Sequence, residues 1–226
     1  MHIKCYDVSY MEKVSQNNDN FPLPIPDNRV VSDDGFFTEV HGSLADENYV
    51  VKKHKGWLLD FQAEKIFDQC KRDYRELKSI FGDSIPNSIF TLADDPEPFR
   101  TDDYTYKNIT IVQEKVFEDK ELNDSTKVEK ILKIEGFILK CIDIFDSTYD
   151  SKTKKGWCVD FTISNLVFGH TAFDDTPKLY FLDSMNAIMN TTVDKLQELV
   201  LKITESLGID SAEITEKMRL IVKKIG

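Results

Sequence analysis

The segment that decides the fold is CVDFTISN, residues 158–165, because it places Asp160 and Asn165 in one short polar stretch. Either residue alone is an ordinary turn former, since Asp and Asn side chains hydrogen-bond the local backbone. Further along, the strand-like stretch LYFL ends at Asp183, and an Asp in such a position is also a common helix N-cap. Together the three side chains supply carboxylate and amide oxygens, which are the ligands that a hard divalent cation prefers in proteins.

Two further polar features come earlier in the chain. Lys52 lies in the strand-like stretch NYVVKK, where a single lysine is most often simply solvated, and the stretch NITIV is followed by EKV at residues 114–116. Phosphoryl transfer needs a cation on the phosphates, oxygen ligands for Mg²⁺ and a carboxylate that orients the attacking hydroxyl. The chain presents these groups in the order lysine, Glu-x-Val, Asp-x-x-x-x-Asn and Asp, which is the order found in protein kinases.

On these residues the chain resembles the protein-kinase-like superfamily over about residues 33–185. DDGFFTEV resembles the glycine-rich loop, with Gly35 as one of its glycines and Val40 as the valine that packs on the adenine. VVKK resembles the V-A-I-K motif, which implies that Lys52 pairs with the phosphates of ATP.

The resemblance also implies a hinge, a catalytic residue and metal ligands. QEKV resembles a gatekeeper followed by a hinge, so the carbonyl of Glu114 and the N–H of Val116 would bond the adenine edge. CVDFTISN is similar to H-R-D-x-x-x-x-N, which implies that Asp160 is the catalytic aspartate and Asn165 a metal ligand. Asp183 would be the principal metal ligand, and the implied cofactors are ATP and Mg²⁺ or Mn²⁺.

The family also pairs the lysine with a carboxylate on the helix that follows it. Apolar residues recur at steps of three and four between Asp60 and about Phe81, which predicts an amphipathic helix ended by Gly82. Three of its carboxylates are candidates: Glu64, Asp73 and Glu76. Asp73 lies nearest the apolar face, but Glu64 has the longer side chain and lies in the N-terminal half of the helix, so we assign the role to Glu64.

Several positions depart from the family pattern. The glycine-rich segment keeps one glycine of three, with Asp33 and Thr38 at the other two positions, which weakens its cradle for phosphates. Cys158 stands in place of the catalytic-loop histidine, and Asp183 is followed by Ser and Met where the family has Phe and Gly. Only 43 residues follow Asp183, so a long activation loop and a peptide-substrate platform are not expected.

The expected fold class is α+β, with a bilobal protein-kinase-like arrangement of a small β-rich N-lobe and a reduced, mainly helical C-lobe. We expect an extended, proline-containing arm over residues 1–28, the N-lobe and hinge over 29–116, and the C-lobe over 117–226. The predicted strands cover residues 35–43, 48–53, 88–93, 108–116, 165–169 and 178–183, and the predicted helices cover 60–81, 127–145 and, in two pieces, 193–225.

The composition indicates the expected partners and cellular compartment of the protein. A formal net charge of −11 over 226 residues disfavours binding to nucleic acid, and no apolar run is long enough for a membrane span. The four cysteines form no C-x-x-C pair, which favours a reducing compartment. We therefore expect a cytoplasmic protein, or a secreted effector that acts in a host cytosol.

Three functions are compatible with these features. The first is an ATP- and Mg²⁺-dependent kinase that acts on a protein Ser or Thr or on a small-molecule hydroxyl. The second is a pseudokinase, a nucleotide-binding or protein-interaction module without turnover, which the single glycine and the missing histidine favour. The third is an acidic interaction protein in which the polar residues are turns and caps. The joint presence of Lys52, Asp160, Asn165 and Asp183 favours the first.

Overall fold

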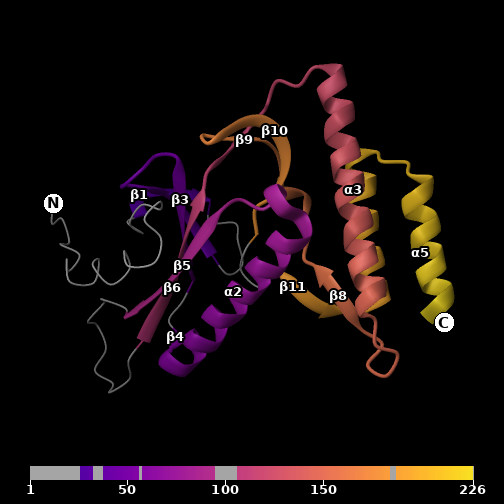
Figure 1. Cartoon of the computed structure of the whole chain (residues 1–226), viewed down its shortest axis with the longest axis horizontal. Coiled ribbons are helices and arrows are strands. Elements are labelled where there is room, and N and C mark those ends of the chain that lie inside the picture. The colour runs from indigo at the N-terminus through magenta and orange to yellow at the C-terminus, as the bar shows by residue number, and fades with distance from the viewer. Residues whose placement is uncertain (1–25, 33–37, 56–57, 95–105, 184–186, 226) are drawn as a thin grey trace. The chain divides into compact units, whose positions relative to one another are not determined.

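The computed structural model describes residues 26–32, 38–55, 58–94, 106–183 and 187–225. The chain divides into two compact units, of which unit 1 comprises Met1–Lys71 and Asn87–Lys115 and unit 2 comprises Arg72–Pro86 and Val116–Gly226. The helix α2 (Asp60–Phe81) belongs to unit 1 up to Lys71 and to unit 2 from Arg72 (Figure 1). The class is α+β, as predicted from the sequence, with four α-helices among the described residues.

Unit 1 is built on one antiparallel sheet. Its strands are β1 (Pro26–Ser32), β2 (Thr38–Ser43), β3 (Tyr49–His54), β4 (Leu58–Leu59), β5 (Ser88–Asp94) and β6 (Tyr106–Glu114). The order is β1-β2-β3-β6-β4, and β5 pairs with β6 along its other edge. The described part of the sheet buries side chains on both faces, since Tyr49, Val51 and Val112 project to one face and Ile109 and Ile111 to the other.

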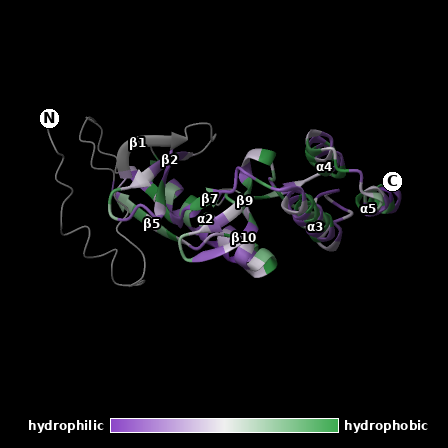
Figure 2. Ribbon diagram, turned by 90° about the horizontal axis from the view of Figure 1, so that it is seen from above, coloured by the Kyte–Doolittle hydropathy of each residue, from purple (hydrophilic) through white to green (hydrophobic). Residues whose placement is uncertain are grey.

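Unit 2 combines helices with short strands. It holds β7 (Val116–Glu118), α3 (Asp124–Thr148), β8 (Gly156–Val159), β9 (Leu166–Thr171), β10 (Asp174–Phe181), β11 (Ile188–Thr191), α4 (Val193–Leu207) and α5 (Ala212–Ile225). Helices α3 and α5 lie side by side, held by ion pairs from Lys217 to Asp143 and from Lys224 to Asp146 (Figure 1). Each of the helices α3, α4 and α5 carries both hydrophobic and hydrophilic residues (Figure 2), as expected of helices with one buried face.

The helix boundaries follow local sequence signals. Asn123 caps α3 by accepting a hydrogen bond from the Thr126 N–H at 2.9 Å, and Thr192 caps α4 in the same way. Helix α4 ends at Gly208, whose φ of 63° is a left-handed conformation that glycine adopts without strain. The predicted break near residues 207–210 is therefore confirmed.

The structure corrects four details of the prediction. The strand β1 begins at Pro26, inside the segment predicted as an arm, and residues 1–25 lie outside the described part. The strand predicted over 108–116 is two strands, β6 and β7, separated at Lys115. Strand β10 ends at Phe181, so Asp183 follows it by two residues. The second half also contains β8 and β11, which were not predicted and make this half less purely helical than expected.

A charged cluster in unit 2 gives a pH-dependent prediction. The Lys178 ammonium bonds the Asp174 carboxylate and lies 3.7 Å from Asp83. This bond from Lys178, followed by one from the Thr176 N–H, lowers the pKa of Asp174 from 3.8 to about 2. Because the pKa is lowered in the folded state, the interaction stabilises the protein above about pH 4 and is lost as the pH falls towards 2. Asp174→Asn should therefore melt below wild type at pH 6.

The measurement is the melting temperature of wild type and Asp174→Asn as a function of pH. The difference between the two proteins should be constant above about pH 5 and should shrink between about pH 4 and 2. Both partners are partly exposed, so we expect a small difference. A difference that grows as the pH falls would contradict the interpretation.

Candidate functional site

In unit 2 the structure brings the segments of Asp160, Asn165 and Asp183 together through backbone hydrogen bonds. The Asp160 N–H donates to the Ala187 carbonyl oxygen at 2.8 Å, and the Leu182 N–H donates to the Asn165 carbonyl oxygen at 2.8 Å. The short 3₁₀ helix η3 (Ile163–Asn165) lies between these two links. Both ends of the DFTISN segment are thus tied to the stretch that contains Asp183.

Strand register explains this arrangement. Strand β8 pairs with β11 so that Val159 lies opposite Ile188, and Asp160 is the next residue. Strand β9 pairs with β10 so that Leu166 lies opposite Phe181, with Asn165 just before one strand and Asp183 shortly after the other. Since paired antiparallel strands keep opposite residues close, the two pairings fix the three polar residues in one loop cluster.

Buried aromatic residues pack beneath this loop cluster. Phe161 is fully buried, and its ring meets that of Phe137 edge to face with centroids 6.1 Å apart. Phe181 is also buried and lies 5.6 Å from the same ring, centroid to centroid. Phe161 therefore points into the core of unit 2, whereas Ile163 is exposed and Asp160, Asn165 and Asp183 are each only partly buried.

Cys158, the residue in place of the family's histidine, belongs to the core. Its side chain is fully buried and its thiol donates to the Val159 carbonyl oxygen at 3.2 Å. Burial, with a smaller effect from the nearby Asp160 carboxylate, raises the pKa of Cys158 to about 12. The thiol is therefore neutral at physiological pH, and Asp160 gains no cationic neighbour from this position.

In unit 1, Lys52 and Val40 share one face of the sheet. They lie directly opposite each other in the β2–β3 pair, and Lys52 also lies opposite Ile111 of β6. Directly opposed residues of an antiparallel pair project to the same face. Lys52 is 8% exposed, so its charge is largely withdrawn from solvent. Gly35, predicted to belong to the same nucleotide site, lies outside the described residues.

The predicted hinge residue Glu114 ends β6. Its N–H donates to the Asn87 carbonyl oxygen at 2.9 Å. The Asn87 N–H, which an antiparallel ladder would direct to the Glu114 carbonyl, donates instead to the Glu114 carboxylate at 3.0 Å. The carboxylate also accepts from Asn87 Nδ2 at 2.8 Å. The Asn87 N–H is therefore bound by the Glu114 side chain and does not occupy the Glu114 carbonyl oxygen.

The second hinge residue, Val116, begins β7 in unit 2. In the β7–β9 pair, Val116 lies opposite Thr171, and the Asp119 N–H donates to the Phe168 carbonyl oxygen at 3.1 Å. Hydrogen-bonded and non-hydrogen-bonded pairs alternate along an antiparallel ladder, so Val116 and Thr171 form a non-hydrogen-bonded pair. The Val116 N–H is accordingly directed away from β9.

The carboxylates of α2 differ sharply in their environments. Glu64, to which the sequence assigned the lysine pairing, is 61% exposed and lies 3.7 Å from Lys107, which also bonds Asp60 at 2.6 Å. Asp73 on the same helix is 3% exposed. Among the described residues, Lys52 and Asp73 are the two charged side chains that are buried. This burial agrees with the predicted position of Asp73 nearest the apolar face of the helix.

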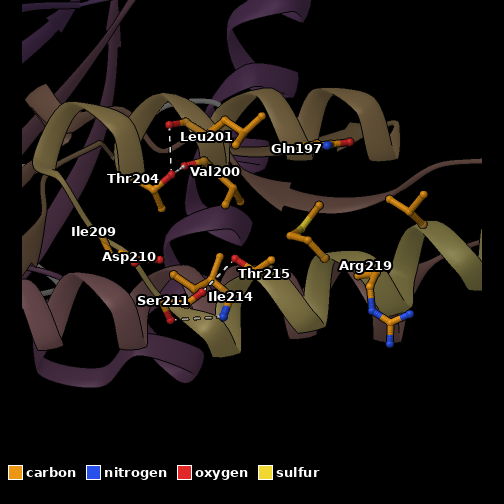
Figure 3. Close-up of a pocket in the computed structure, with 12 residues that line it drawn as sticks. Gln197, Val200, Leu201, Thr204, Ile209, Asp210, Ser211, Ile214, Thr215 and Arg219 are labelled. Atoms are coloured by element: carbon orange, nitrogen blue, oxygen red, sulfur yellow. Dashed lines mark hydrogen bonds between the residues drawn. The ribbon is translucent and has the colours of Figure 1, made fainter.

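A groove in the described part of the chain lies elsewhere in unit 2, between α4 and α5 (Figure 3). It encloses about 400 Å³, and none of its lining residues is a predicted site residue. Thr204 in its wall donates its hydroxyl to the Val200 carbonyl oxygen, and Thr215 donates to that of Ser211, just before α5. The lining is mixed, since it combines apolar side chains with Gln197, Asp210, Ser211 and Arg219.

The described residues contain no group of three or more His, Cys, Asp and Glu side chains arranged to hold a metal ion. The metal ligands predicted from the sequence are only two, Asn165 and Asp183, and the first of them is an amide, so they do not form such a group. None of the helices in the described ranges has the length and apolar character that crossing a bilayer requires. The chain matches no protein-family model, and comparison with curated proteins found no relative.

Proposed function

We propose that this chain is an ATP- and Mg²⁺-dependent phosphotransferase with a kinase-like arrangement of its two units. The observation that carries the proposal is the pair of backbone hydrogen bonds in unit 2, from Asp160 to Ala187 and from Leu182 to Asn165. These bonds bring the backbone segments of Asp160, Asn165 and Asp183 together, and this supports the proposal because phosphoryl transfer uses two carboxylates and an amide in this chain order.

Each residue has a defined role in the proposal. Asn165 and Asp183 hold the metal ion, and their oxygen donors fit Mg²⁺ or Mn²⁺ by chemical type. A bound metal would neutralise charge on the phosphates of ATP. Asp160 accepts the proton of the attacking hydroxyl and orients it, which its partly exposed position permits. The acceptor is a hydroxyl of a protein or of a small molecule.

The remaining residues are assigned to binding of the nucleotide base and the phosphates. Lys52 pairs with the phosphates, and Val40, on the same face of its sheet, packs on the adenine with Gly35 before it. The carbonyl of Glu114 and the N–H of Val116 bond the adenine edge. The backbone directions of both groups support this assignment.

The carboxylate that balances Lys52 is assigned to Glu64, as the family resemblance implies. Glu64 is 61% exposed and lies 3.7 Å from Lys107, so its pairing with Lys52 would compete with this surface ion pair.

A second candidate is a nucleotide-binding module without turnover. The buried, neutral Cys158 in place of the catalytic-loop histidine favours it, because this position offers no charge to the loop. The two candidates share the binding residues and differ in the role of Asp160, so nucleotide binding alone does not separate them.

The experiment that tests nucleotide and metal binding is thermal unfolding with ATP, in the presence and absence of Mg²⁺ or Mn²⁺. A ligand that binds only the folded state stabilises it, and ATP at about 100 times its Kd should raise the melting temperature by about 5–10 °C. The shift should need the metal and should disappear in Asp183→Ala. Asp175→Ala, which removes an exposed carboxylate of β10, is the matched control and should keep the shift.

Two results would count against the proposal. The absence of any shift in wild type with either metal would remove the nucleotide site. An equal metal-dependent shift in wild type and Asp183→Ala would show that ATP binds, but through residues other than those assigned here.

A further inference from the structure

Strand β7 of unit 2 is fixed to β9 by two side chains that both contact His170. The Asp119 carboxylate lies 3.0 Å from His170 Nδ1, and the Asp119 N–H bonds the neighbouring Phe168 carbonyl oxygen. The Phe117 ring stacks on the imidazole with centroids 5.7 Å apart and an angle of 21° between the planes. His170 is thus held between residues 117 and 119, which project to the same face of β7.

The backbones of the two strands approach closely at this point. Gly169 lies opposite Glu118, and a Cβ atom at residue 169 would clash with the Phe117 carbonyl oxygen. A glycine is needed here because the carbonyl occupies the space of a side chain. The close approach and the His170 contacts together restrict how β7 can shift along or rotate away from β9.

We propose that His170, together with Asp119 and Phe117, positions the Val116 N–H for recognition of the adenine base. This inference rests on the proposed function, in which that N–H donates to adenine. The contacts to His170 hold β7 in the register in which Val116 is a non-hydrogen-bonded position. A donor held in its binding direction before the ligand arrives loses less conformational freedom on binding, so affinity is higher.

A purely structural role for the same contacts makes a different prediction. If the contacts to His170 only stabilised the fold, their loss would change the melting temperature of the free protein and leave the affinity of the folded protein for ATP unchanged. A positioning role changes the Kd and KM for ATP but leaves kcat at saturating ATP unaltered, since no residue near the transferred phosphate is touched.

The experiment measures the Kd for ATP with Mg²⁺ by calorimetric titration, and the rate of ATP hydrolysis, for a set of full-length variants. His170→Ala and Asp119→Ala should each weaken ATP binding by up to about tenfold, the effect of losing one hydrogen bond. His170→Asn keeps a donor for Asp119 and should recover part of the affinity. Asp175→Ala, an exposed carboxylate on β10 outside these contacts, is the control and should bind as wild type does.

Hydrogen exchange of the Val116 amide in the nucleotide-free protein provides a second measurement that does not depend on ATP. Exchange at Val116 should be faster in His170→Ala than in wild type, because β7 is less restrained. This readout remains informative if a variant is less stable, since it can be compared with the exchange of amides in α3.

The outcomes separate the two proposals. If wild type does not bind ATP, the proposed function is overturned and this inference falls with it. If wild type binds and both alanine variants bind equally well, the positioning role alone is overturned. Unchanged exchange at Val116 in His170→Ala, or an equal loss of affinity in Asp175→Ala, would also overturn it.

Discussion

Asp160→Asn should bind ATP and Mg²⁺ as wild type does, but should transfer phosphate about 10²–10⁴-fold more slowly, the usual contribution of a general base. Asparagine has nearly the same shape as aspartate, and the bond that places this residue, from its N–H to the Ala187 carbonyl oxygen, involves only the backbone. The loop should therefore keep its conformation while the side chain loses its ability to accept a proton. The measurement is the rate of ATP turnover with radiolabelled γ-phosphate, with water or the protein itself as acceptor.

The matched control for this variant is Asp175→Asn, which makes the same chemical change on the exposed surface of β10. It should leave turnover unchanged. Equal turnover in Asp160→Asn and wild type would remove Asp160 from the mechanism. Metal-dependent ATP binding without turnover in wild type would support the binding module and exclude the phosphotransferase.

Asp73→Asn should destabilise the protein by about 3–5 kcal/mol, the cost of leaving the partners of a buried charge uncompensated. The Asp73 side chain is 3% exposed, so its charge is withdrawn from water. The free energy of unfolding should be measured by denaturant titration without nucleotide.

Glu64→Gln is the control on the same helix, and at 61% exposure it should change stability by less than about 0.5 kcal/mol. Equal stability of Asp73→Asn and wild type would contradict the prediction for the buried carboxylate.

Much of the local structure could be predicted from the sequence. The helix from Asp60 to Phe81 has the predicted limits, because its apolar residues recur with the helical period and Gly82 follows, with a φ of 58°. The hairpin of β2 and β3 and the two C-terminal helices were also predicted correctly. The strands β8 and β11 were missed because GWCV and IMNT are too short to show an alternating pattern.

The sequence alone determined the residue types of the candidate site, their order along the chain and the acidic composition. These properties suggest phosphoryl transfer through Lys52, Glu114, Asp160, Asn165 and Asp183. Only the tertiary structure decided which residues share a loop and which are buried. The pairing of β8 with β11 joins Asp160 to the segment after Asp183, and burial distinguishes Asp73 from Glu64 on one helix. Local patterns determine helices and turns because they involve near neighbours in the chain. Strand register and burial depend on contacts between segments far apart in the sequence, and local sequence patterns do not reveal these contacts.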